Sequence, residues 1–327
     1  VYFSVRKDNN YGKLSGRDLD DLQSGARVEV DNRKQDPLDF ALWKSAKPGE
    51  PYWESPWGKG RPGWHIECSA MSLKYLGTEF DIHGGGQDLI FPHHENEIAQ
   101  SECLTGQVMA KYWLHNGFIT VDNEKMSKSL GNFFTVREVA EQYGYEVIRY
   151  MMVQAHYRSP INYCKELLDA CKASLERLYA CRETLDHAIE VAKSGAIAPE
   201  AAALFEQRRQ QFITAMDDDL NTADGMTAVF ELVRDLNRMS ADAATPKEQL
   251  QAGAALMDEL TGVLGILYNR KKQEAIPANV QELVEQRAAA RKAKDFAKAD
   301  QLRDAIAALG YQIQETRQGT KLTKLAE

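Results

Sequence analysis

No stretch of the sequence is apolar over the length that a membrane span needs, and no charged n-region followed by an apolar h-region opens it. Cysteine is scarce, because the 327 residues contain only five, an odd number without paired spacing. This usage excludes a disulfide framework and indicates a reducing, cytoplasmic setting. Positive charge is not in excess either, since the net charge is −8. That balance argues against a general nucleic-acid coat, although a local basic patch can still bind RNA.

What the sequence does contain is typical of a protein that folds around buried cores. Hydrophobic residues make up 43% of the chain and charged residues 27%, and 327 residues are enough for two or three domains. The first residues, Val1–Val5, read as a strand already under way, and no initiator methionine precedes them. We therefore expect the chain to be part of a longer protein.

A basic segment, Lys125-Met126-Ser127-Lys128-Ser129, stands between a strand-like stretch at 113–121 and a turn signal at Gly131-Asn132. Two lysines three positions apart, interleaved with hydroxyl groups, suit a loop that neutralises charge on a departing polyphosphate. A solvated surface loop is the alternative for an isolated pair of lysines with this spacing. The full pentapeptide is more specific than the pair and favours the phosphate-binding interpretation.

Three potential metal ligands occur upstream of the lysine segment. Pro92 is placed to begin a helix, and His93 and Glu97 then share one face of it at i and i+4. With Cys68 they offer a thiolate, an imidazole and a carboxylate, which is a plausible zinc set. Each residue also has a structural alternative, namely a small buried group, a hydrogen-bonding residue at a helix start and a surface charge.

The same region has the pattern of a nucleotide-binding α/β sheet. Phe80–His83 predicts a short buried strand, and Gly84–Gly86 predicts a turn that lets a ligand approach the backbone closely. A later strand at 113–121 leads into the lysine segment. This order fits the second half of a Rossmann-type domain. Before it, Trp53 and Trp57 lie among prolines and glycines, where aromatic rings often cover irregular segments.

After Asn132 the apolar residues recur at helical spacing. We expect a helix at 203–216, a helix capped by Asn221 and a helix from about Lys247. Two apolar stripes are expected to form the core of a helical bundle: Leu168, Cys171, Leu175, Leu178, Cys181 and Leu185, then Leu250, Leu256, Leu260, Val263, Leu264 and Leu267. Residues 268–277 read as a linker. A basic helix with Arg287–Arg303, a turn at Gly310 and a strand at 311–313 follow.

The predicted fold class is therefore α/β then all-α. A partial Rossmann-type nucleotide-binding domain is followed by a helical bundle and a small C-terminal α/β unit. We expect residues 1–132 to form the C-terminal portion of a catalytic domain and residues 133–270 a stem-contact region with a helical bundle. Residues 278–327 are expected to form a small recognition unit.

The lysine segment resembles the second signature of class I aminoacyl-tRNA synthetases, whose lysines stabilise the pyrophosphate leaving group. Several further segments resemble cysteinyl-tRNA synthetases of the bacterial type: Asp36–Lys44, Gly63–Met71, His83–Gln87, Phe91–Gln100, Met216–Thr222 and Arg291–Asp304. The resemblance runs from about Val1 to Gly319. It implies that cysteine and ATP form cysteinyl-adenylate and that the cysteinyl group then passes to tRNA(Cys).

The resemblance also implies a zinc ion, held in this family by two cysteines, a histidine and a glutamate. The matching positions here are Cys68, His93 and Glu97. The family's other zinc cysteine and its His-Ile-Gly-His signature belong to an N-terminal region that this sequence lacks. The chain is therefore expected to be inactive alone. Zinc would bind the thiolate of the substrate, so that serine is rejected without editing.

By the same resemblance, Trp64 and His83 are expected to line the amino-acid pocket. Gly84, Gly85 and Asp88 are expected to lie beside the adenosine of ATP. ATP would enter with Mg²⁺.

Lys125 and Lys128 are expected to act on the phosphates, with Lys128 as the direct ATP contact. Where the related bundles show Asp-Ala-Leu-Arg, this chain has Glu146-Val147-Ile148-Arg149, which keeps the charged ends around a bulkier middle. The C-terminal basic unit is expected to read the anticodon. The resemblance further implies a cytoplasmic monomer without a membrane partner.

Two alternatives stay open from the sequence. A cysteine ligase acting on an amino sugar would share the zinc and lysine motifs, but it would lack the long C-terminal part after Tyr150. A non-catalytic tRNA-binding fragment would explain the missing N-terminal part, but it would have no use for the segment Lys125–Ser129.

Overall fold

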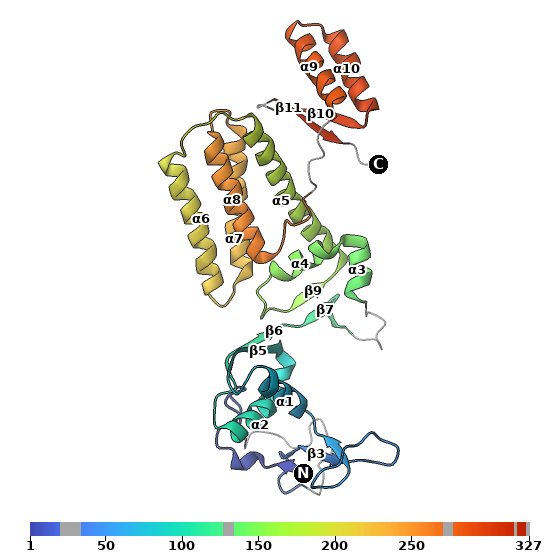
Figure 1. Ribbon diagram of the computed structural model, residues 1–327, viewed down its shortest axis with the longest axis vertical. Coiled ribbons are helices and arrows are strands. Elements are labelled where there is room, and N and C mark those ends of the chain that lie inside the picture. Colours follow the sequence, from blue (N-terminus) through green and yellow to red (C-terminus); the bar gives the residue numbers. More distant parts are fainter. Residues whose placement is uncertain (20–33, 127–133, 271–276, 317–318, 325–327) are drawn as a thin grey trace. The chain divides into compact units, whose positions relative to one another are not determined.

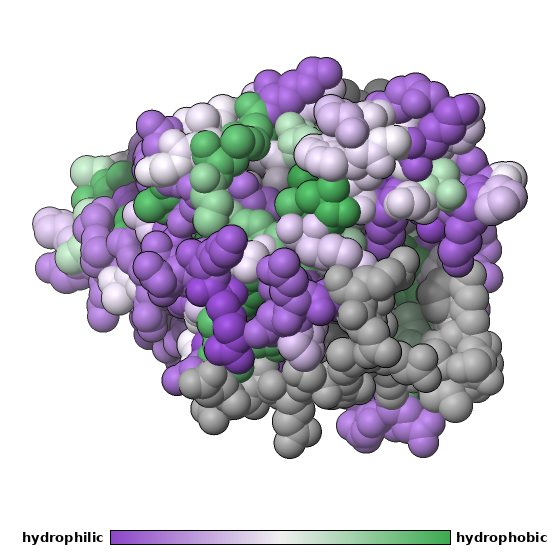
Figure 2. Space-filling view, turned by 90° about the horizontal axis from the view of Figure 1, so that it is seen from below, coloured by the Kyte–Doolittle hydropathy of each residue, from purple (hydrophilic) through white to green (hydrophobic). Residues whose placement is uncertain are grey.

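The structure is a computed structural model that describes residues 1–19, 34–126, 134–270, 277–316 and 319–324. The chain divides into two compact units, residues 1–119 with 158–160, and residues 120–157 with 161–327 (Figure 1). The face seen in Figure 2 is mostly hydrophilic, with hydrophobic residues in small separate groups. Among the helices of the described residues, none combines the length and the apolar character that crossing a membrane requires.

The first unit contains two parallel strands joined by a helix. Strand β5 (Phe80–Gly86) pairs in parallel with β6 (Ala110–Asn116). Helix α2 (Glu95–Thr105) lies between them in the chain, preceded by the short turns η2 (Gln87–Leu89) and η3 (Ile90–His94). In such a β–α–β unit the segment after the first strand lies at its carboxyl end, where α/β sheets bind their ligands.

The other elements of this unit are short strands, a single helical turn and one helix. They are β1 (Tyr2–Phe3), η1 (Val5–Lys7), β2 (Phe40–Ala41), β3 (Trp43–Ser45), β4 (Gly60–Pro62) and α1 (Ile66–Tyr75). β1 pairs with β2, and β3 pairs with β4, both in antiparallel fashion. The β3–β4 hairpin thus leads directly into α1.

Two expectations for β5 are wrong. The predicted turn at Gly84–Gly86 is instead the second half of the strand, paired with Leu114–Asn116 of β6. Glycine is used because the neighbouring strand passes so close that a Cβ on Gly84 would lie 2.8 Å from the carbonyl oxygen of Leu114. The strand is also not buried, since the side chain of Ile82 is 63% exposed.

The second unit begins with a small sheet and continues as helices. Strands β7 (Ile119–Val121), β8 (Glu124–Lys125) and β9 (Ile161–Tyr163) form a sheet in the order β8-β7-β9. The helices are α3 (Val136–Tyr143), α4 (Tyr145–Val153), α5 (Lys165–Val191), α6 (Pro199–Asp217), α7 (Thr222–Ala241) and α8 (Lys247–Leu264). Helices α5 to α8 pack side by side as the predicted bundle (Figure 1).

The core of the bundle follows the predicted apolar spacing on α5. The six residues of that stripe, from Leu168 to Leu185, are at most 5% exposed, and each buried leucine contributes roughly 1.5–3 kcal/mol. The predicted cap is confirmed, because the side chain of Asn221 accepts a hydrogen bond from the backbone N–H of Asp224 at 3.1 Å. The stripe on α8 is wrong at Val263, which is 60% exposed, and Leu267 is buried beyond the end of the helix.

The C-terminal elements of the second unit pack on one another. They are α9 (Ala278–Lys292), α10 (Phe296–Ala308), β10 (Tyr311–Thr316) and β11 (Gly319–Lys324), with β10 and β11 antiparallel. The prediction of a single basic helix here is wrong, because the helix is interrupted between Lys292 and Phe296. Lys294 has a φ of 61°, and Asp295 caps α10 by accepting from the N–H of Lys298 at 3.1 Å.

Candidate functional site

Cys68 is positioned by helix α1, whose preceding residues lie close against the backbone of Ala41 and Leu42. The backbone N–H of Gly63 donates to the carbonyl oxygen of Leu42 at 2.7 Å. A Cβ on Gly63 would lie 1.7 Å from the carbonyl oxygen of Ala41, so only glycine fits there. His65 follows with a φ of 75° as the N-cap of α1, which places Cys68 in the first turn of the helix. Trp64, between them, is 72% exposed.

Helix α2 contributes two buried carboxylates with different surroundings. Glu95 is 1% exposed and accepts hydrogen bonds from the backbone N–H groups of Gly12 at 3.0 Å and Ser15 at 2.9 Å. These bonds anchor the start of α2. Glu97 is 4% exposed, and its Oε2 lies 3.0 Å from Nε2 of His83. This contact is an ion pair when His83 is protonated, and Oε2 accepts no hydrogen bond that meets the geometric criteria from the described residues. A buried carboxylate oxygen without a donor is suited to a cation.

Histidines surround Glu97. The metal-binding atoms of His83, His94 and Glu97 all lie within 4.8 Å of one another. His94 Nδ1 in turn lies 2.8 Å from Nε2 of His115, which orients the ring. Burial lowers the pKa of His94 to about 4 and also lowers the pKa of His115. These two imidazoles are therefore neutral at pH 7, which is the form that binds metal.

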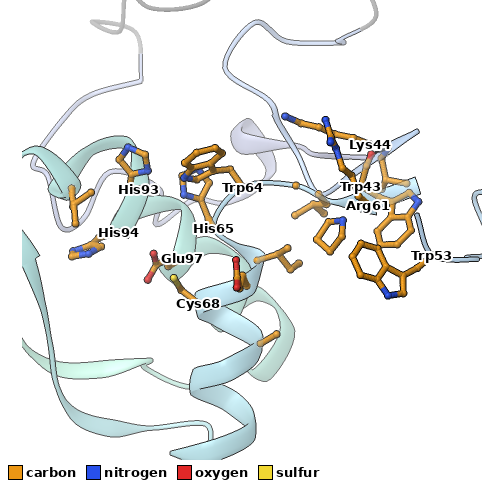
Figure 3. Close-up of a pocket in the computed structure, with 18 of the residues that line it drawn as sticks. Trp43, Lys44, Trp53, Arg61, Trp64, His65, Cys68, His93, His94 and Glu97 are labelled. Carbon is orange, nitrogen blue, oxygen red and sulfur yellow. Dashed lines mark hydrogen bonds between the residues drawn. The ribbon is translucent and has the colours of Figure 1, made fainter. Parts of the chain in front are cut away.

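Cys68 lies beside the same carboxylate. Desolvation by the surrounding protein, followed by the neighbouring carboxylate of Glu97, raises the pKa of the Cys68 thiol. Figure 3 shows the sulfur next to Glu97, with His94 farther along the same cavity. Without a cation the thiol keeps its proton, whereas a bound metal would favour the thiolate. The donor set of sulfur, imidazole and carboxylate thus fits zinc.

These residues line one cavity of about 1310 Å³. Most of the predicted site residues in this unit share it: Trp64, Cys68, His83, Gly84, His93 and Glu97. Gly85 and Asp88 lie on the adjoining segment, outside the lining. A Cβ on Gly85 would meet Leu89 at 2.8 Å, and a Cβ on Gly86 would meet Asp88 at 2.5 Å. The side chain of Lys125, and all of Lys128, lie outside the described residues.

The structure adds residues that the sequence interpretation missed. His65 and His94 line the cavity, and burial lowers the pKa of each to about 4. The adjacent His93-His94 pair was a signal for the second histidine, since both residues line the cavity. Trp53 and Arg61 also line the cavity, because the β3–β4 hairpin brings them there.

Three families match consecutive parts of the sequence. Residues 1–173 match the tRNA synthetases class I (C) catalytic domain, residues 211–268 the DALR domain, and residues 273–321 the cysteinyl-tRNA ligase anticodon binding domain. A protein from Caldicellulosiruptor saccharolyticus named cysteine–tRNA ligase is 52% identical over 327 residues, covering 99% of this chain and 70% of that protein. The chain belongs to the cysteine–tRNA ligase family.

A second cysteine–tRNA ligase, from Halalkalibacterium halodurans, is 54% identical over 322 residues, which cover 98% of this chain and 69% of that protein. The fold is also similar to that of a solved LeuRS from Agrobacterium radiobacter K84, with a TM-score of 0.51 and 17% identity over 68% of this chain and 33% of that one. The predicted family and the predicted fold class, α/β followed by helices, are thereby confirmed.

Proposed function

We propose that this protein ligates cysteine to tRNA(Cys) at the expense of ATP, through a cysteinyl-adenylate. The observation that carries the proposal is the cavity that Cys68, His83, His93 and Glu97 all line, in which His83, His94 and Glu97 form the cluster of potential metal ligands. It occurs in a chain about half identical to proteins named cysteine–tRNA ligase. A zinc site that selects a thiol needs sulfur, imidazole and carboxylate ligands, and the cavity offers all three. Among the described residues, no group donates a hydrogen bond to Oε2 of Glu97.

Zinc would be held by Cys68, His93 and Glu97, with His83 and His94 as neighbouring imidazoles. When bound, it would supply a Lewis acid that holds the substrate's sulfur as a thiolate and so separates cysteine from serine. Trp64 and His83 would form the walls of the amino-acid pocket. The contact between His94 and His115 would fix the orientation of the His94 ring, which stays neutral because its pKa is lowered to about 4.

ATP, with Mg²⁺, would lie along the end of β5, beside Gly84, Gly85 and Asp88. The carboxylate of cysteine attacks the α-phosphorus, the α–β phosphoanhydride bond breaks, and pyrophosphate leaves. A ribose hydroxyl at the 3′ end of the tRNA then attacks the carbonyl carbon, and AMP leaves. Lys125 and Lys128 would neutralise the charge that develops on the pyrophosphate, with Lys128 as the direct contact.

The remaining domains would bind tRNA. We assign residues 1–132 to the catalytic domain, 133–270 to the stem-contact region and bundle, and 278–327 to anticodon recognition. The matches to the DALR and anticodon binding domains support this assignment. They also disfavour a ligase that acts on an amino sugar, which has no use for either domain. We further propose that the protein acts as a monomer in the cytoplasm.

Metal analysis tests the zinc site. We expect about one zinc per chain in the full-length protein and much less in Cys68→Ala, because a thiolate ligand is lost. Cys103→Ala is the matched control, since Cys103 is also an exposed cysteine but does not line the cavity. Equal zinc contents in the two variants would reject Cys68 as a ligand.

ATP–pyrophosphate exchange tests the lysine segment separately. We expect Lys128→Ala to slow exchange far more than it weakens cysteine binding, because its charge acts on the leaving group. Equal losses in both measurements would mean that the role of Lys128 is structural. Exchange in wild type with serine in place of cysteine should be far slower than with cysteine.

A further inference from the structure

A two-residue turn stands just before Lys125. Val121 of β7 pairs with Glu124 of β8, so only Asp122 and Asn123 join the two strands. Both turn residues are in the left-handed region, with φ of 50° and 66°. A two-residue hairpin of this kind needs positive φ at both central positions, and glycine is the usual second residue. Neither residue is glycine here, so further contacts are needed to hold the turn.

The strand on the other side of β7 supplies those contacts. In the sheet order β8-β7-β9, β9 lies beside β7 (Figure 1). The side-chain oxygen of Asn162, in the middle of β9, accepts hydrogen bonds from the backbone N–H of Asn123 at 2.7 Å and from the hydroxyl of Thr120 at 3.2 Å. The N–H of Asp122 donates to the carbonyl oxygen of Tyr163 at 3.2 Å. Both N–H groups of the turn are therefore bound to β9, one of them through a side chain.

The oxygen is the part of the Asn162 carboxamide that holds the turn. A backbone N–H can only donate, so the atom that faces Asn123 is Oδ1 rather than Nδ2. Aspartate at this position would offer an acceptor oxygen in the same place, whereas alanine would offer none. The contact can therefore be removed or kept by a single substitution.

Strand β8 has little else to fix its register. It consists of Glu124 and Lys125 and lies at the edge of the sheet, paired with β7 alone among the described residues. The register of a hairpin follows its turn, and a slip of one residue turns every side chain of a strand to the opposite face. Thr120 and Lys125 are register partners. The turn that Asn162 holds thus also decides where the backbone of Lys125 lies.

Lys125 is the residue through which this turn can affect the reaction. A charge stabilises a departing pyrophosphate only where it is correctly placed, and a misplacement of about 1 Å can cost on the order of 100-fold in rate. We propose that Asn162 is a positioning residue for adenylate formation: its side-chain oxygen fixes the Asp122–Asn123 turn, and the turn fixes Lys125. Asn162 contributes no reacting atom. The inference rests on the proposed function of Lys125 and adds a residue to it.

ATP–pyrophosphate exchange in the full-length protein tests the proposal. We expect Asn162→Ala to lower the kcat of exchange by about 10- to 100-fold and to leave the KM for cysteine nearly unchanged. Asn162→Asp should keep most of the activity, because a carboxylate oxygen can accept the same two hydrogen bonds. Thr120→Val removes only the longer bond and should lose less than Asn162→Ala. The matched control is Asn237→Ala, since Asn237 is an exposed asparagine on α7 of the same unit.

A double-mutant cycle separates positioning from a general loss of structure. If Asn162 acts through Lys125, Asn162→Ala should have little further effect on exchange in a Lys125→Ala background. Equal fold-losses in the wild-type and Lys125→Ala backgrounds would indicate a general structural role and would overturn the proposal. Equal exchange rates in Asn162→Ala and Asn162→Asp would also overturn it.

Trypsin cleavage after Lys125 gives a second measurement that does not depend on catalysis. Asn162→Ala should be cleaved there faster than wild type, and Asn162→Asp at the wild-type rate, because a backbone that opens more often is cut more readily. Equal cleavage of all three would contradict the proposal. Unchanged exchange in Lys125→Ala alone would instead reject the proposed function of Lys125. Slow exchange in Lys125→Ala with normal exchange in Asn162→Ala would reject only the role of Asn162.

Discussion

Replacement of Glu146 by alanine should destabilise the helical bundle. Glu146, in the first turn of α4, is 5% exposed and accepts hydrogen bonds from the hydroxyl of Tyr179 at 2.8 Å, from Nδ2 of Asn269 at 3.0 Å and from the backbone N–H of Leu267. One turn later, Arg149 Nε donates to the carbonyl oxygen of Leu264 at 2.7 Å. The charged ends of the Glu146–Arg149 segment therefore both hydrogen-bond to the chain at the end of α8.

The magnitude follows from what the three donors would lose. The N–H of Leu267 is buried, so losing its acceptor leaves an unsatisfied group, which costs about 1–3 kcal/mol. The N–H groups of Asn269 and the hydroxyl of Tyr179 can partly reach water and should cost less. The total is about 3–5 kcal/mol, the sum of about 1–3 for the buried N–H of Leu267 and about 1 for each of the two partly solvated donors. For a unit of this size that corresponds to a fall in the unfolding midpoint of roughly 6–20 °C.

Thermal and urea unfolding, followed by far-UV circular dichroism, measures the effect. Glu176→Ala is the matched control, because Glu176 lies on the exposed face of α5. Tyr179→Phe removes only the hydroxyl and should cost about 1 kcal/mol. If Glu146→Ala and Glu176→Ala unfold at the same temperature, the carboxylate does not hold the end of α8 and the reasoning is wrong.

Two further predictions concern buried groups of the same unit. Arg208 donates to Asp235 at 3.0 Å and its side chain is 11% exposed, whereas Arg209 pairs with Glu259 at 2.9 Å and its side chain is 34% exposed. In urea unfolding, Arg208→Ala should lower the free energy of unfolding by about 3–5 kcal/mol. Arg209→Ala should lower it by at most about 1 kcal/mol. Burial raises the pKa of Cys171 and of Cys181 to about 11, so at pH 8 both stay protonated and should react with a thiol reagent only after unfolding; rapid labelling of either in the folded protein would contradict this.

The helical bundle could be predicted from the sequence because its determinants are local. Leu168, Leu178 and Leu185 repeat at helical spacing, and each is fully buried. The cap at Asn221 follows from the preference of its side chain for the N–H groups of a helix start. Neither feature depends on a partner that is distant in the sequence.

The errors arise where a distant segment decides the outcome. Gly84 is part of a strand because Leu114 of β6 lies against it, although three consecutive glycines favour a turn. Val263 fits the apolar spacing of α8, but it is 60% exposed. The break before Phe296 depends on the left-handed conformation of Lys294, which is uncommon for lysine.

The candidate site was only partly predictable for the same reason. Cys68, His93 and Glu97 could be grouped by their chemistry, and the structure lines one cavity with all three. The neutral pair His94–His115 could not be foreseen, because the two residues are on different elements and meet only in the fold. The tryptophans of the β3–β4 hairpin likewise reach the cavity through strand pairing rather than through sequence proximity.

The glycine half of β5 limits how this protein could be re-engineered for another amino acid. A methyl group at Gly84 would push against the backbone of β6, and one at Gly85 or Gly86 would press on Leu89 or Asp88. At Gly84 the wall of the cavity therefore accepts no new side chain unless β5 and β6 move apart, whereas at Gly85 and Gly86, which lie outside the cavity lining, neighbouring side chains would have to shift. Variant libraries should instead sample positions on α1 and on the hairpin before it, where side chains already point into open space.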